Sequence, residues 1–146
     1  MIAFAGTVWR MTFAGRDATT PVTSPEGRFH HSGQWAVYAS LSPEGTAVAI
    51  RRYLRPDDLP RLICPLVVKA DRVADLRGRD DMSVIWQDNR ATGAASPTWA
   101  QSDAARAAGA QALLYSSRSR PDLSHLVAFV PEILTADTQR TALPWP

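Results

Sequence analysis

Side chains suited to binding an anionic, ring-bearing ligand are concentrated between residues 26 and 40. Arg28 offers a guanidinium fork, Tyr38 an aromatic face and Ser40 a hydroxyl, while His30 and His31 add two imidazoles. The stretch begins with turn residues and continues with aromatic and β-branched residues, which predicts a loop that leads into a strand. We therefore expect these side chains to lie close together and to form a nucleotide pocket.

The elements before this stretch carry a second guanidinium. Residues 4–12 alternate loosely and predict a first strand, with Arg10 at its inner end. Residues 14–33 are rich in glycine, proline, serine and threonine and predict a long loop. A loop of this length inside a compact domain is usually functional, and we interpret it so.

Two Ser-Pro pairs predict the starts of two helices. Ser42 is a suitable N-cap, with Pro43 at the first helical position and Glu44 in the first turn, and this helix is expected to continue to Leu54 before Pro56. The second helix is expected to run from 96 to 108 and to end at a glycine.

The remaining elements complete a fold of the α+β class. Strands are predicted at 60–70, where Pro65 favours an edge position or a bulge, and at 112–116 and 126–130, with a short turn at 73–76. We expect one domain over residues 1–146, built as a small twisted mixed or antiparallel sheet with two main helices. The apolar tail, 132–146, is expected to dock on the domain or on a partner.

Bulk composition is that of an ordinary globular domain. Hydrophobic residues make up 45% and charged residues 21% of 146, and no apolar run approaches the roughly 20 residues that span a bilayer. Without a basic N-terminal region we expect no signal peptide, no membrane partner and a cytoplasmic location. The net charge is only +2 and no arginine stripe alternates with aromatics, so direct nucleic-acid binding is not expected.

Common catalytic and metal-binding motifs are missing. The sequence has no Gly-rich phosphate loop, His-Glu-x-x-His or Cys-x-x-Cys motif. The single cysteine, Cys64, lies in an apolar run, which favours a buried structural thiol over a nucleophile. A site formed by His30, His31 and His125 is conceivable, but adjacent strand residues point to opposite faces, and we expect no metal.

The order of several short motifs resembles the RES domain family, the toxins of type II toxin–antitoxin pairs. The family reads as an early Trp/Tyr-Arg, a Gly-Gly-Arg-Trp-Asn turn, Tyr-x-Ser, a helix with a glutamate and a late Pro-Ser-x-Arg. Here Trp9-Arg10, Gly27-Arg28-Phe29-His30, Tyr38-Ala39-Ser40 and Ser117-Arg118 are similar to the first, second, third and last of these. The resemblance covers about residues 7–130.

The resemblance implies a fold similar to ADP-ribosyltransferases and a protein that consumes NAD as a substrate. It implies transfer of ADP-ribose to a protein acceptor, such as phosphoribosyl pyrophosphate synthetase, and a cognate antitoxin with a helix-turn-helix domain. The residues expected in catalysis are Arg28, Tyr38 and Ser117. The residues expected to bind the dinucleotide are Arg10, Arg28, His30, Tyr38, Ser40, Ser117 and Arg118.

The family glutamate falls on Ile50 in this chain, and an isoleucine cannot stabilise an oxocarbenium-like transition state. Glu44 is a substitute if the start of its helix faces the pocket, although a first-turn carboxylate has a helix-dipole role by default. The alternatives to a transferase are therefore an NAD glycohydrolase or phosphorylase and an inactive module that binds NAD or a protein. For Tyr38, the histidines and Ser117, purely structural roles in the core or in turns stay open.

Overall fold

A long two-stranded ribbon forms the base of the molecule. The computed structural model describes residues 1–145, apart from the side chain of Arg52. Strand β1, Ile2–Phe13, pairs antiparallel with β3, Arg61–Asp75, and Trp9 lies opposite Pro65. Both strands are longer than predicted, and the turn predicted at 73–76 is wrong, because Val73–Asp75 extend β3 to pair in parallel with β4.

Pro65 lies neither at an edge nor at a bulge, so that prediction is wrong. Strand β3 has partners on both sides, and the one register irregularity of the ribbon lies near Ile2 and Phe4 of β1. The Pro65 carbonyl accepts a hydrogen bond from the Asp137 N–H, 3.3 Å away. In a strand, the nitrogen and the carbonyl of one residue point to the same side. The proline nitrogen, which has no hydrogen to donate, therefore points to the side of β6 and β7, at a position between the residues that pair with these two strands, so no ladder hydrogen bond is lost.

The other strands close the sheet into a ring. They are β2 Val37–Ser40, β4 Ala112–Ser116, β5 Ser124–Ala128, β6 Leu134–Ala136 and β7 Leu143–Pro144. The strand order is β1-β2-β5-β4-β3-β6, and β1 also pairs with β3, so five strands are joined in a closed circuit. The β3–β4 pair is parallel and the other pairs are antiparallel, which confirms a mixed sheet.

Residues 1–145 contain the two main helices that were predicted, α1 and α3, and a short additional helix, α2. They are α1 Pro43–Ile50, α2 Trp86–Ala91 and α3 Pro97–Ala107, and single 3₁₀ turns lie at Arg51–Tyr53, Asp80–Met82 and Pro131–Ile133. The Ser42 hydroxyl accepts from the Gly45 N–H and Ser96 caps α3, as their Ser-Pro pairs predicted. Helix α1 ends at Ile50, earlier than predicted, and continues as a 3₁₀ turn.

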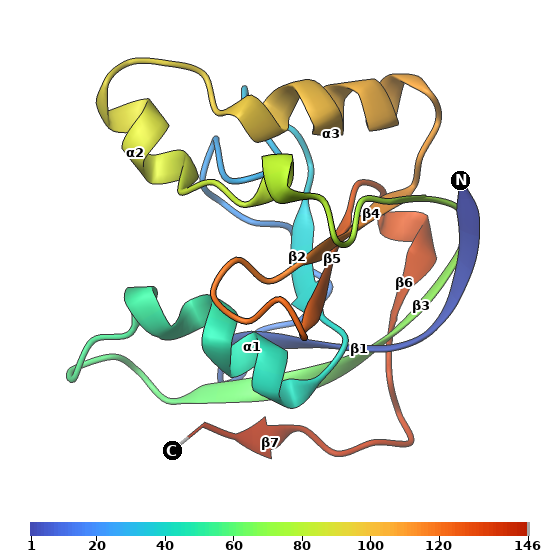
Figure 1. Cartoon of the computed structure of the whole chain (residues 1–146). Coiled ribbons are helices and arrows are strands. Elements are labelled where there is room, and N and C mark those ends of the chain that lie inside the picture. The colour runs from blue at the N-terminus through green and yellow to red at the C-terminus, as the bar shows by residue number, and fades with distance from the viewer. Residues whose placement is uncertain (146) are drawn as a thin grey trace.

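The helices lie at opposite ends of the molecule. Helix α1 packs beside β1, whereas α2 and α3 lie beyond the far ends of β2 and β5 (Figure 1). One apolar cluster, with Val8, Leu66 and Leu126 at its centre, fills the ring of strands. A second cluster lies beneath α3 and contains Phe29 and Leu113, both fully buried. The α+β prediction is confirmed.

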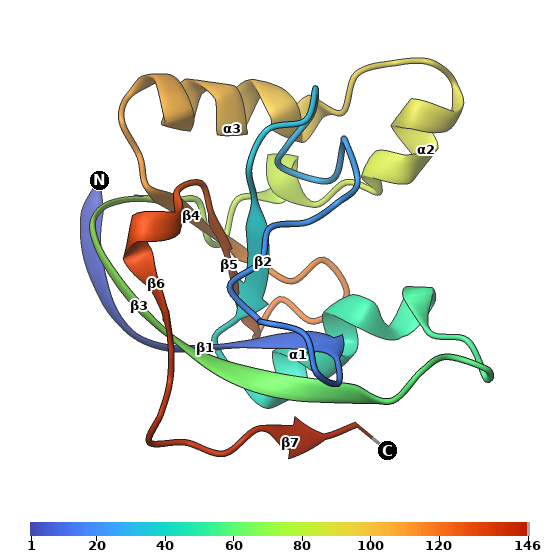
Figure 2. The same ribbon diagram turned by 180° about the vertical axis from the view of Figure 1, so that it is seen from behind.

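The C-terminal tail returns to the base of the molecule. Strands β6 and β7 both pair with β3, on the side away from β1 (Figure 2). The last residue of the tail, Pro146, lies outside the described residues. Within residues 1–145, no helix has the length and apolarity needed to cross a membrane.

Candidate functional site

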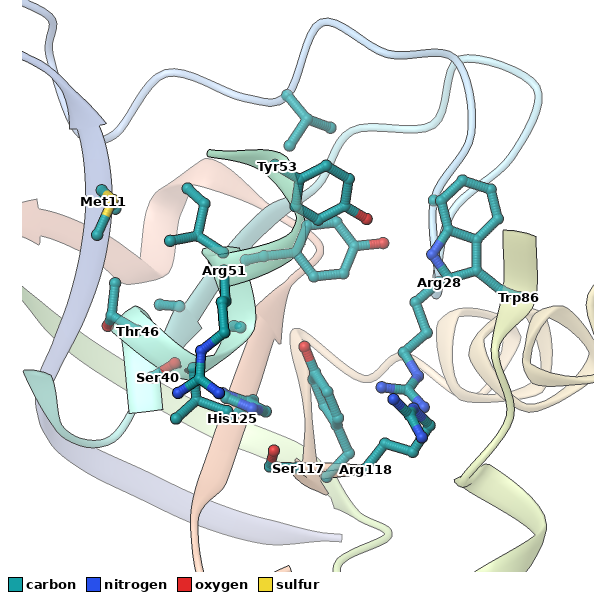
Figure 3. A pocket seen from close by; sticks show the side chains of 18 of the residues that line it. Met11, Arg28, Ser40, Thr46, Arg51, Tyr53, Trp86, Ser117, Arg118 and His125 are labelled. Carbon is teal, nitrogen blue, oxygen red and sulfur yellow. Dashed lines mark hydrogen bonds between the residues drawn. The ribbon is translucent and has the colours of Figure 1, made fainter. Parts of the chain in front are cut away.

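A cavity of about 880 Å³ lies between α1 and the segment that leads into α2. Parts of β2, β4 and β5 form its floor, and side chains from both ends of the molecule point into it (Figure 3). The structure brings seven predicted site residues to this cavity from distant parts of the chain. They are Arg10, Arg28, His30, Tyr38, Ser40, Ser117 and Arg118.

Arg28 and Arg118 form a positively charged site that has no carboxylate partner among residues 1–145. Arg28 Nη2 donates to the carbonyls of Met82 and Val84, 3.0 and 2.9 Å away, and its guanidinium lies 5.7 Å from the ring centre of Tyr115. Arg118 is exposed and makes no hydrogen bond within the described residues. The two guanidinium groups overlap in the view of Figure 3, and they lie close enough for the charge of Arg118 to act on Arg28. Burial first, and then the charge of Arg118, lowers the pKa of Arg28.

Two like charges held close together in a partly buried cavity repel each other, which favours the binding of an anion between them. Arg51, from the turn after α1, also points into the cavity, and no described residue pairs with it. Arg28 Nη1 has no partner among the described residues, so it is available for a ligand. The arrangement therefore offers several donors to phosphate oxygens.

Arg10 is held differently from these arginines. Its Nη1 donates to the carbonyl of Ala18, 2.7 Å away, and to that of Thr20, which ties the long loop after β1 to that strand. Burial lowers the pKa of Arg10. That Arg10 binds pyrophosphate stays a prediction, because its Nη1 is engaged by the loop, whereas Nη2 and Nε have no hydrogen-bond partner within residues 1–145.

Tyr38 and His30 are joined in a chain of hydrogen bonds. The Tyr38 hydroxyl accepts from the Phe29 N–H at 2.9 Å and lies 2.7 Å from His30 Nδ1. His30 Nε2 lies 3.0 Å from the Ser24 carbonyl and must donate to it, which leaves Nδ1 to accept the hydroxyl proton of Tyr38. Burial lowers the pKa of His30 and raises that of Tyr38, so both groups are neutral at pH 7.

The packing of His30 and Tyr38 also explains why residue 27 is a glycine. A methyl group on Gly27 would lie 2.5 Å from His30 Cε1 and 3.0 Å from the Tyr38 hydroxyl. The turn that carries Arg28 therefore packs against the two rings without space for a side chain. His30 and Tyr38 brace the turn, and the Tyr38 ring still faces the cavity.

His31 does not join the site, so the prediction that it would is wrong. Its Nε2 lies 2.8 Å from Asp103 Oδ2, and its ring lies 4.9 Å from that of Trp99. These partners belong to α3, whereas His30 is fully buried beside Tyr38. Adjacent side chains in an extended segment point to opposite sides, which separates the two imidazoles.

The floor of the cavity contains a histidine, His125, that the sequence analysis considered only as a possible metal ligand. His125 on β5 lies opposite Ser40 on β2, and its Nδ1 is 2.6 Å from the Ser40 hydroxyl. Ser117 is 4% exposed, and its hydroxyl accepts from the Arg120 N–H at 3.3 Å. Because β2 and β5 are distant in sequence, no local pattern indicates the Ser40–His125 contact.

Glu26 supplies the one carboxylate among the described residues that line the cavity. It pairs with Arg90, 3.1 Å away. Glu44 lies outside the lining and pairs with Arg120 at 3.1 Å, so the start of α1 does not bring it into the site. Ile50 does line the cavity, at the end of α1. Within residues 1–145, no group of three or more His, Cys, Asp or Glu side chains is placed to hold a metal ion.

Comparisons with known proteins agree with this fold. The family model described as RES domain matches residues 7–146. One similar solved structure is that of the M. tuberculosis MbcT-MbcA toxin-antitoxin complex, with 20% identity and a TM-score of 0.65. The match covers 99% of this chain and 86% of the other. No curated protein matches the sequence.

Proposed function

The chain belongs to the RES domain family, and from this premise we propose that it is a toxin that uses NAD as its substrate. The proposed reaction transfers ADP-ribose to a protein acceptor in the cytoplasm, for which phosphoribosyl pyrophosphate synthetase is a candidate. The domain would then share an ADP-ribosyltransferase-like arrangement.

The observation that carries the proposal is the unneutralised pair Arg28 and Arg118 in a cavity of about 880 Å³. A dinucleotide combines a doubly charged pyrophosphate with two flat ring systems. The pair matches the pyrophosphate, and the rings of Tyr38, Tyr53 and Trp86 line the same cavity as stacking surfaces. The volume lies within the range of ligand pockets, roughly 300–1,000 Å³.

Cleavage of the nicotinamide–ribose bond builds positive charge on the sugar, and a nearby carboxylate lowers the energy of that state. Arg28 would hold the pyrophosphate, the Tyr38 ring would stack on the nicotinamide and Ser117 would contact a ribose or amide group. Glu26 is the one carboxylate among the described residues that line the cavity, but its ion pair with Arg90 offsets its charge. We therefore propose slow transfer to a bound acceptor, which supplies its own nucleophile.

Two other functions follow from specific features. An NAD glycohydrolase or phosphorylase would use the same cavity, with water or phosphate as the acceptor. Ile50 favours an inactive module that binds NAD or a protein, because an apolar residue lies where the family has a glutamate. Free ADP-ribose or its phosphate identifies a degrading enzyme, a labelled protein identifies a transferase, and unchanged NAD identifies the binding module.

The proposed partner is a cognate antitoxin with a helix-turn-helix domain. The similar solved structure is a toxin-antitoxin complex, which supports a partner of this kind. An antitoxin would most simply act by filling the cavity or covering Arg28. A gene for a small helix-turn-helix protein immediately beside this one would support the pairing.

Growth arrest on expression in bacteria tests the proposal. Arg28→Ala and Arg118→Ala are expected to abolish the arrest, because each removes a charged contact to the pyrophosphate worth about 1.5–3 kcal/mol. Arg140→Ala is the matched control, since Arg140 pairs with Asp137 away from the cavity. Unaltered arrest by Arg118→Ala, whose side chain is exposed and makes no hydrogen bond or ion pair within residues 1–145, would overturn the site assignment.

A further inference from the structure

The reaction proposed above gives no role to the buried contact between Ser40 and His125, although Ser40 is among the residues expected to bind the dinucleotide. Both side chains are nearly sealed, at 2% and 4% exposed, and both line the cavity. They come from neighbouring strands and lie directly opposite each other in the β2–β5 register. Figure 3 shows both side chains on the floor of the cavity, between Thr46 and Ser117.

The positions of the protons follow from the contacts. The Ser40 hydroxyl has one partner among the described residues, His125 Nδ1 at 2.6 Å. If Nδ1 donated, the hydroxyl proton of Ser40 would be buried without an acceptor, at a cost of about 1–3 kcal/mol. If the hydroxyl donates, Nδ1 accepts, and the ring proton of the neutral imidazole must lie on Nε2.

The environment keeps this imidazole neutral. Burial first, and then the charge of Arg28, lowers the pKa of His125 to about 4. The Tyr115 ring lies 5.2 Å from the imidazole and restricts its rotation. His125 Nε2 has no hydrogen-bond partner within residues 1–145, and it is not among the side-chain nitrogens that are sealed without a partner. A fixed N–H donor is therefore left facing the cavity.

We propose that His125 is a substrate-binding residue whose Nε2–H donates a hydrogen bond to an oxygen of the ADP-ribose half of the substrate. Ser40 is a positioning residue that holds the donor tautomer. The proposal rests on the function proposed above. The Tyr115 ring lies 5.7 Å from the Arg28 guanidinium and 5.2 Å from the imidazole, so the imidazole lies near the anion site, where phosphate and ribose oxygens would lie.

Two substitutions of His125 distinguish the roles of its two ring nitrogens. The amide of a glutamine at 125 reaches about as far as Nε2, whereas that of an asparagine reaches about as far as Nδ1. Calorimetric titration with ADP-ribose is expected to show His125→Gln binding about fivefold or more tightly than His125→Asn, the effect of one hydrogen bond. Equal affinities of these variants and the wild type would overturn the inference and leave the proposed function intact. A wild type that does not bind ADP-ribose at all would overturn both.

The tautomer has a signature that a purely structural role would not change. In ¹⁵N-labelled protein, His125 is expected to show a protonated Nε2 and an unprotonated Nδ1, and the Nε2 resonance is expected to shift when ADP-ribose is added. Ser40→Ala is expected to give a mixture of tautomers and severalfold weaker binding, whereas Ser40→Thr, which keeps the hydroxyl, restores the single tautomer. A protonated Nδ1 in the wild type would contradict the assignment.

Discussion

The low pKa of His125 makes the stability of the protein depend on pH in a defined window. In an unfolded chain a histidine titrates near 6.5, whereas burial beside Ser40 and Tyr115, together with the Arg28 charge, lowers the pKa to about 4. Between these values the unfolded state binds more protons than the folded state. The free energy of unfolding therefore falls as the pH falls from 6.5 towards 4.

The size of this effect follows from the same two pKa values. At pH 7.5 the contribution is close to zero, and at pH 4.5 the linkage relation gives a loss of about 2.5 kcal/mol. For a domain of this size, with a urea m-value of about 2 kcal/mol/M, the loss corresponds to a midpoint shift of about 1 M. His125→Gln cannot titrate, so its midpoint should lack this part of the pH dependence.

Urea unfolding of both proteins at pH 7.5, 6.5, 5.5 and 4.5 makes the comparison. Other titrating groups act in both proteins and cancel in the difference, because none except the neighbours of His125 is changed. The wild-type advantage over His125→Gln is expected to shrink by about 2.5 kcal/mol from the highest to the lowest pH. Parallel pH trends would refute the burial of a neutral His125.

Three further substitutions test the cavity. Ile50→Glu is expected to raise NAD turnover, because it puts a carboxylate on the cavity wall; no increase would mean that the alignment of this helix is wrong. Glu26→Gln is expected to lower any NAD cleavage at least about tenfold, whereas Glu44→Gln, outside the cavity, should match the wild type. Gly27→Ala is expected to cost about 1–3 kcal/mol of stability by overpacking, measured by thermal unfolding. Gly6→Ala is the control, because the nearest atom to its added methyl group would be Phe4 Cζ at 3.6 Å, an ordinary contact distance. An equal loss of stability in the Gly27 and Gly6 variants would contradict the packing of the turn.

Features fixed by neighbouring residues were predictable from the sequence. Each Ser-Pro pair places a hydroxyl acceptor before a residue whose φ is already helical, so the starts of α1 and α3 were predicted correctly. The end of α3 was also correct, because Gly109 adopts a φ of 84°. The bounds of β4 and β5 were predicted to within two residues, because each strand is a short run of apolar neighbours.

Features fixed by distant residues were not predictable. Residues Val73–Asp75 contain no strong strand pattern, and they are extended because Ala112–Leu114 offer them a parallel partner. His31 faces Asp103, and His125 faces Ser40, across strand and helix contacts that span 72 and 85 residues of chain. The grouping of the arginines around one cavity was expected only from the family resemblance, since Arg28 and Arg118 share no local motif.

The fate of labelled NAD tests the central claim most directly. The purified protein is incubated with bacterial extract and NAD labelled in its ADP-ribose half, beside the Arg118→Ala variant. Proposed transfer predicts label on a protein band with the wild type and a band at least about tenfold weaker with the variant. Intact NAD and no labelled protein with the wild type would contradict it.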